Sequence, residues 1–300
     1  MRGRTLFAYL FQQTEFMQKT PLKAKYLRAS AALNDQLCYF LFARSQLRTT
    51  FDNFKISDAG HLFLKSAFAK NRYAPKINIR IDQVQPFESE HERVTFGAYV
   101  STSYETTAAG YISAALDVLK NTNSASFVLK QKKTPEDTYW NTLSASGCTN
   151  PALELRLTLS YIRQRRNHFI HLAPSLTQTL TNLIQHQGSA LNAYWRPTIR
   201  ELDFTSTTVT HFSERESIDL LMLLRIIIQR LDGHLASQLT PAGVIELVTS
   251  QLFASRPSRI NADIRSNRVR KISSVLKRDF GYKGPLSDIE NAAQRIGTRV

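Results

Sequence analysis

The spacing of apolar side chains predicts a protein built almost entirely from α-helices. Apolar residues recur near the helical period through residues 22–52, which contain neither glycine nor proline and can follow a start at Pro21. The same pattern predicts further helices over residues 4–17, 57–70, 91–120, 152–171, 174–194 and 213–236, with more beyond Pro241. Only KINIRID, residues 76–82, alternates like a strand, and it has no evident pairing partner. The expected fold class is therefore all-α.

Local signals mark helix ends and close contacts. TPED at 134–137 predicts a helix start capped by its threonine, and SERE at 213–216 predicts a capping box. DGH at 232–234 predicts a helix end. Gly97 and Gly110 lie inside a helical pattern, where glycine indicates a kink or a close approach between helices.

The most apolar predicted helix covers residues 213–236 and is hydrophobic on nearly every side, so we expect it to be central. The chain has 300 residues, of which 42% are hydrophobic, which is enough to build a core. We expect two parts, a helical domain over residues 1–236 and a basic helical extension over residues 237–300.

Charge changes this picture most. The chain carries 39 basic and 24 acidic residues, a net charge of +15, which favours a polyanionic partner. Nucleic acid is preferred over a membrane surface because no basic amphipathic helix stands out. Six cations fall on one candidate helix near the C-terminus, where they would bind nucleic acid or form an ordinary solvated surface: Arg265, Arg268, Arg270, Lys271, Lys277 and Arg278.

Other classes of protein find little support. Cys38 and Cys148 are the only cysteines, so we expect a reducing compartment, the cytoplasm, and no metal site or cofactor. The longest apolar stretch, residues 220–231, is interrupted by Arg225 and is too short to span a bilayer. The first residues contain only six consecutive apolar positions and no cleavage site, so we expect no signal peptide. Hydrolase, P-loop and dinucleotide motifs do not occur.

The stretch RQRRNHFIH, residues 163–171, concentrates chemistry at a predicted helix end, before the break at Pro174. Arginine suits phosphate, and histidine can transfer a proton near neutral pH. Asn167 and His171 share a helix face because they are four residues apart. We expect Arg163, Arg165 and His168 to add contacts to nucleic acid. The alternative is a solvated helix end with no catalytic role.

The R-N-x-x-x-H motif formed by Arg166, Asn167 and His171 resembles that of the HEPN superfamily of ribonucleases. The resemblance implies a helical bundle, with additional C-terminal helices in this chain, and a homodimer that brings two motifs together. It implies metal-independent RNA cleavage, in which the ribose 2′-hydroxyl attacks the adjacent phosphate. Arg166 would stabilise phosphate charge, His171 would move a proton or position the hydroxyl, and Asn167 would fix the geometry. Such proteins act in phage defence, as toxins or as effectors.

One position departs from the toxin members. Many of them carry tyrosine two residues after the histidine, where a nucleotidyltransferase antitoxin modifies it, and Ala173 stands there in this chain. Regulation by an antitoxin of that kind is therefore in doubt, although another regulatory protein partner stays open. Two alternatives also stay open: a non-catalytic nucleic-acid-binding or regulatory module that uses the basic C-terminal helix, and a scaffold subunit of a larger assembly.

Overall fold

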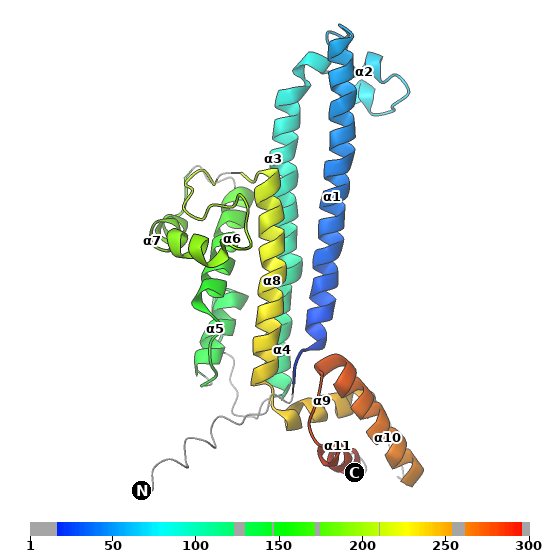
Figure 1. Ribbon diagram of the computed structural model, residues 1–300, viewed down its shortest axis with the longest axis vertical. Helices are drawn as coiled ribbons and strands as arrows, with labels where there is room; N and C mark the ends of the chain where they lie inside the picture. The colour runs from blue at the N-terminus through cyan, green and yellow to red at the C-terminus, as the bar shows by residue number, and fades with distance from the viewer. Residues whose placement is uncertain are drawn as a thin grey trace. The chain divides into compact units, whose positions relative to one another are not determined.

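The computed structural model describes residues 17–122, 130–145, 147–171, 175–209, 211–253 and 262–295. Across these ranges the fold is all-α, as predicted, and contains no strand (Figure 1). Nearly all of the predicted helix over residues 4–17 lies outside them. The main helices are α1 (Pro21–Ile56), α3 (Val84–Ser103), α4 (Gly110–Thr122), α5 (Pro135–Ala145), α6 (Leu153–His171), α7 (Gln178–Trp195), α8 (Glu214–Gln238), α9 (Pro241–Phe253), α10 (Ala262–Val275) and α11 (Leu286–Arg295).

The chain divides into two compact units, and each is described by itself. Unit 1 combines residues 1–27, 106–153 and 226–300, and unit 2 combines residues 28–105 and 154–225. This grouping differs from the predicted division into residues 1–236 and 237–300. The C-terminal helices α9, α10 and α11 pack on one another, and α9 also packs on α4. The apolar helix α8 contributes buried residues to both units, with Leu223 and Leu224 in unit 2 and Ile227 and Ile228 in unit 1.

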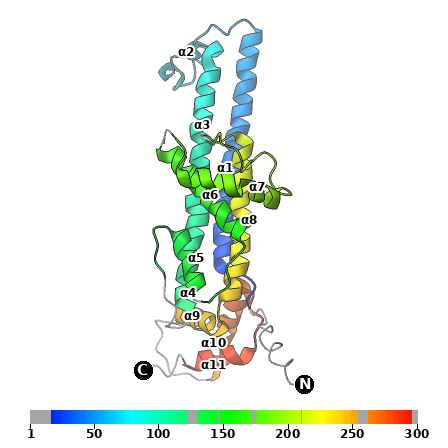
Figure 2. The same cartoon turned by 90° about the vertical axis from the view of Figure 1, so that its left-hand side faces the viewer.

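In unit 2, α1 and α3 run side by side (Figures 1 and 2). The close approach predicted at Gly97 is present, because a Cβ built there would clash with the Phe169 ring of α6. Helix α3 continues into a π-helical segment, η3 (Tyr104–Ala109), which ends where Gly110 begins α4. The second predicted glycine therefore stands at an irregularity of the helix.

Residues 57–83 correct two predictions. The helix expected over 57–70 is reduced to the single turn α2 (Leu64–Ala67), and the expected strand over 76–82 is absent. One isolated bridge joins Phe63 and Arg80, and it is followed by a short 3₁₀ turn, η2 (Ile81–Gln83). The alternating isoleucines instead pack into a small core with four buried residues, Phe51, Leu64, Ile81 and Val84. Alternation here reflects burial on this core rather than membership of a sheet.

Helix starts follow local signals closely. The Thr134 hydroxyl oxygen accepts a hydrogen bond from the Asp137 N–H at 3.1 Å, which caps α5 as predicted. The capping box of α8 also forms: Glu216 N–H donates to Ser213 Oγ at 3.2 Å, and Ser213 N–H donates to Glu216 Oε2 at 3.4 Å. Helix α7 begins later than predicted, because Thr177 caps it by accepting from the Leu180 N–H at 3.3 Å.

In unit 1, the break predicted at residues 232–234 does not occur, since α8 continues to Gln238. Tertiary contacts explain why an aspartate stands inside this helix. Asp232 is fully buried and accepts hydrogen bonds from the N–H and hydroxyl of Thr20 and from the Tyr111 hydroxyl. The Gln18 N–H donates to the carbonyl of Phe280 at 3.0 Å. Residues 17–20 are thus held by α8 and by the C-terminal helices of the same unit.

Candidate functional site

The last turns of α6 carry the candidate motif, and the helix ends at His171 as predicted. Its buried residues include Leu155, Leu159 and Ile162, spaced three or four apart, so this stripe faces the core of unit 2. Arg166 and Asn167 are half-buried and His171 is exposed. The motif therefore lies at the boundary between the core and solvent.

Arg166 is held from two directions within unit 2. Its Nη1 donates to the side-chain oxygen of Asn167 at 2.8 Å. Its Nη2 lies 2.7 Å from a carboxylate oxygen of Glu105, and the two side chains are 23% and 47% exposed. Glu105 belongs to η3, and π-helical segments occur often at functional sites. The guanidinium is thus oriented while still reaching solvent.

His171 stands apart from this pair. Among the described residues, no hydrogen bond joins its ring to Arg166 or Asn167. The imidazole is exposed at the C-terminal end of α6. The structure therefore brings Arg166 and Asn167 together, and the exposed ring of His171 has no described hydrogen bond to either of them.

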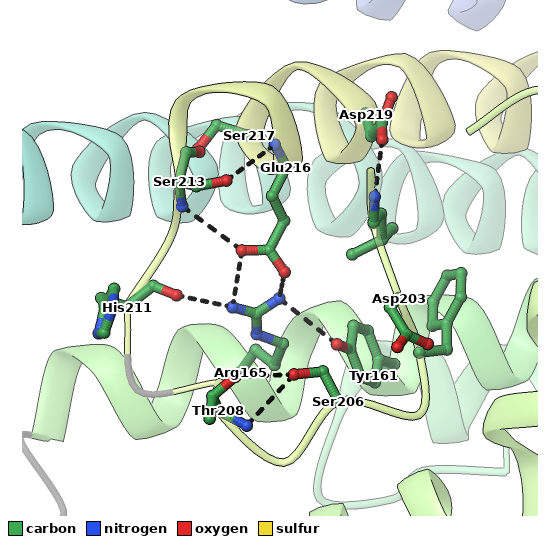
Figure 3. Close-up of polar contacts among 12 residues, drawn as sticks. Tyr161, Arg165, Asp203, Ser206, Thr208, His211, Ser213, Glu216, Ser217 and Asp219 are labelled. Carbon is green, nitrogen blue, oxygen red and sulfur yellow. Dashed lines mark hydrogen bonds and ion pairs between the residues drawn. The ribbon is translucent and has the colours of Figure 1, made fainter. Parts of the chain in front are cut away.

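Arg165 has the opposite environment, although it is the neighbour of Arg166. Its side chain is 0% exposed and pairs through both terminal nitrogens with the Glu216 carboxylate (Figure 3). Nη2 also donates to the His211 carbonyl at 2.9 Å, and the guanidinium lies 4.4 Å from the ring centre of Phe212. Burial raises the pKa of the neighbouring Tyr161 hydroxyl, which lies 3.4 Å from Nη1. Arg165 is a core residue that ties α6 to the start of α8.

The carbonyl that meets Arg165 comes from the connection between α7 and α8, which buried Asp219 holds in place. One carboxylate oxygen of Asp219 accepts from the N–H groups of Arg200, Glu201 and Leu202 at 3.0, 2.8 and 2.9 Å. Figure 3 shows Asp219 on α8 beside this connection. Two residues of α8 therefore shape the surroundings of Arg165: Glu216 pairs with it directly, and Asp219 holds the first part of this connection.

This arrangement corrects part of the predicted nucleic-acid surface. Arg165 and His168 are buried, at 0% and 4% exposed, so neither presents its side chain to a polyanion at the surface of unit 2. Arg163 is half-buried. The predicted contact surface around the motif is reduced to Arg163, Arg166 and His171.

The cations of the basic C-terminal helix also differ in burial. Arg268 is 5% exposed and its guanidinium lies 5.3 Å from the ring centre of Phe253, so it serves the core of unit 1. Arg265 is half-buried. Four cations are exposed on α10 and on the π-helical segment η4 (Leu276–Phe280): Arg270, Lys271, Lys277 and Arg278. Among these, Arg278 is paired with Asp279 at 2.6 Å.

Two carboxylate partners of the basic cluster were not predicted: Glu105, which pairs with Arg166, and Glu216, which pairs with Arg165. A signal for Glu216 existed, because Arg165 continues the apolar stripe of α6 and a buried arginine requires a carboxylate partner. The capping box already placed Glu216 at a defined helix start. No local signal identifies Glu105, since its contact with Arg166 depends on how η3 and α6 pack.

Within the described ranges, no three histidine, cysteine, aspartate or glutamate side chains gather as a metal site would require. No helix of the described residues is long and apolar enough to cross a membrane. Comparisons with family models, with curated proteins and with solved structures found no match for this chain.

Proposed function

We propose that the chain is a metal-independent endoribonuclease of HEPN type that acts as a homodimer, in phage defence or as a toxin or effector. One observation supports this above the others: a partly exposed Arg166, oriented by Asn167 and Glu105, lies five residues before an exposed His171. Each terminal nitrogen of arginine carries two N–H groups. Nη1 and Nη2 can therefore keep their present partners and still donate to phosphate oxygens.

The chemistry follows from these groups. The ribose 2′-hydroxyl loses its proton and attacks the adjacent phosphorus, and the bond from phosphorus to the 5′ oxygen breaks. That oxygen takes a proton, which leaves a cyclic phosphate and a free 5′-hydroxyl. Arg166 stabilises the negative charge that grows on the phosphoryl oxygens. His171 gives or accepts one of the protons, and the motif of a second copy supplies a further imidazole.

The test is cleavage of a labelled RNA in the presence of a metal chelator. We expect His171→Ala and Arg166→Ala each to lower the rate by about 100-fold or more, a typical effect of losing a proton-transfer group or a charge stabiliser. Matched controls are His186→Ala and Arg156→Ala, which remove an exposed imidazole and an exposed guanidinium elsewhere in unit 2. Intact RNA with the wild-type protein, or equal rates with and without His171, would refute the proposal.

A second candidate function is nucleic-acid binding without catalysis, supported by the exposed cations of α10 and η4. Arg270, Lys271 and Lys277 are exposed, whereas Ile272 and Leu276 of the same two segments are buried. Replacing Arg270 and Lys271 with glutamate would abolish function under this alternative, whereas His171→Ala would change nothing.

A further inference from the structure

The end of the α1–α3 hairpin carries a basic and aromatic surface that neither candidate function uses. Residues 57–83 join the two helices at this end (Figures 1 and 2). They contain five basic and two acidic residues, a net charge of +3. The segment belongs to unit 2 and is organised by its own small core. The small core therefore gives the exposed groups of this segment defined positions.

Tyr73 is the centre of this surface. Its side chain is 53% exposed although it is a large aromatic residue. Arg72 lies with its guanidinium carbon 4.7 Å from the ring centre, and the Lys76 ammonium lies 5.9 Å from it. Both cations are themselves exposed. An accessible ring is thus flanked by two positive charges.

The backbone fixes the position of this tyrosine. The side-chain oxygen of Asn71 accepts from the Tyr73 N–H at 2.9 Å. A 3₁₀ turn, η1 (Ala74–Lys76), follows at once and buries Ala74. The Lys76 N–H donates to the Tyr73 carbonyl at 2.9 Å. The backbone that carries the ring is therefore ordered before any ligand stacks on it.

The surrounding charges are not neutralised within unit 2. Lys65, Lys70, Arg72 and Lys76 are exposed, and none forms an ion pair with an acidic residue of the described chain. By contrast, Arg80 is paired with Asp82 at 2.8 Å. A second exposed ring is present in the same segment, because Phe63 is 38% exposed with the Lys65 ammonium 5.5 Å from its centre. The Arg72 guanidinium donates to the Tyr73 hydroxyl, which leaves its positive charge unneutralised. Exposed rings interleaved with cations that no carboxylate neutralises match the alternating bases and phosphates of a single strand.

We propose that this surface, defined by Phe63, Lys65, Lys70, Arg72, Tyr73 and Lys76, binds single-stranded RNA at a position separate from the cleavage motif. An unpaired base stacks on Tyr73, and Arg72, Lys76 and the neighbouring lysines contact phosphates. The choice of RNA over DNA rests on the proposed ribonuclease function, whereas the preference for unpaired bases rests on the accessible ring.

The test measures binding of a labelled RNA of about 12 nucleotides by fluorescence anisotropy, in a His171→Ala background so that the RNA stays intact. We expect Tyr73→Ala to weaken binding by about tenfold, and Tyr73→Phe to stay close to the parent because it keeps the stacking ring. Tyr39→Ala is the matched control, since Tyr39 is 72% exposed on α1 of the same unit. Replacing Arg72 and Lys76 with glutamine should make the affinity for RNA less dependent on salt. For each residue, the slope of log affinity against log salt concentration should fall by about the amount that one phosphate contact contributes.

Parent-like affinity of Tyr73→Ala, or equal losses in Tyr73→Ala and Tyr39→Ala, would overturn the proposal. Tighter binding to a duplex of the same sequence would also overturn it. So would Tyr73-dependent binding to phosphatidylserine vesicles without any effect on RNA, which would assign the surface to a membrane. The wild-type protein tests cleavage separately. Tyr73-dependent binding without cleavage would reject only the proposed function, and His171-dependent cleavage without Tyr73-dependent binding would reject only this surface.

Discussion

Replacing Glu216 by glutamine removes the negative charge that faces Arg165 and changes little else. Glutamine also serves as the fourth residue of a capping box, so the contact with Ser213 at the start of α8 can persist. The amide can still accept one hydrogen bond from the guanidinium. The variant therefore reports on the loss of the ion pair rather than on the loss of the helix start.

The expected loss of unfolding free energy is large because the buried guanidinium of Arg165 does not reach solvent when its carboxylate partner is removed. Its side chain is 0% exposed, and that of Glu216 is 17% exposed. Breaking one partner of a buried pair destabilises a protein by about 3–5 kcal/mol. The His211 carbonyl, the Tyr161 hydroxyl and the Phe212 ring remain around the cation, so we expect about 3 kcal/mol.

Urea unfolding followed by tryptophan fluorescence can isolate unit 2. Trp140 belongs to unit 1, and Trp195 belongs to unit 2, where its indole N–H donates to Thr158 of α6 at 2.8 Å. In a Trp140→Phe background, Trp195 is the only tryptophan and reports on the surroundings of α6. Glu201→Gln is the matched control, because it breaks an exposed ion pair with Arg215 in the same unit, and we expect no measurable change.

A double-mutant cycle completes the test. Arg165→Met removes the buried charge, so Glu216→Gln should be much less damaging in that background than in the parent, with a coupling of about 2 kcal/mol. A loss below about 1 kcal/mol for Glu216→Gln, together with no coupling to Arg165→Met, would refute the assignment of Arg165 to the core.

Three further outcomes follow from the structure. Gly97→Ala should destabilise unit 2 by about 1–3 kcal/mol in the same urea assay, because the clash with Phe169 outweighs the gain in helix propensity; a stabilised variant would contradict this. Burial raises the pKa of Asp232 above its ordinary value of 3.8, so the contribution of this carboxyl to stability is present below pH 3.8 and is lost as pH rises through the raised pKa. The stability of the wild type relative to Asp232→Asn, read from Trp140 in a Trp195→Phe background, should therefore fall as the pH rises above 3.8, and a constant difference would reject the shift. Iodoacetamide should label exposed Cys38 before Cys148, whose thiol is half-buried with a pKa raised by burial, as peptide mass mapping can show; equal rates would count against this burial.

Features of the fold that depend on nearby residues were predictable from the sequence. The period of apolar residues predicted the long helices, and the capping signals at Thr134 and Ser213 predicted helix starts, because each involves groups within one or two turns. The failures lie where distant contacts decide the structure. Residues 76–82 pack on the core built around Phe51, and Asp232 is bonded to Thr20, so neither segment follows its local pattern.

Two adjacent residues of the candidate site also show that contacts between distant parts of the chain were not predictable from local sequence. In sequence, Arg165 and Arg166 are equivalent members of one basic cluster, yet a helix turns by about 100° per residue and sends them to different surroundings. Arg165 continues the stripe of Leu155 and Ile162 and meets a carboxylate that lies 51 positions later in the chain. Its neighbour meets Glu105, in another helix, at the edge of the core. Because one arginine anchors the last turns of α6, the other is held in a defined orientation without being buried, as the proposed contact with a phosphate requires.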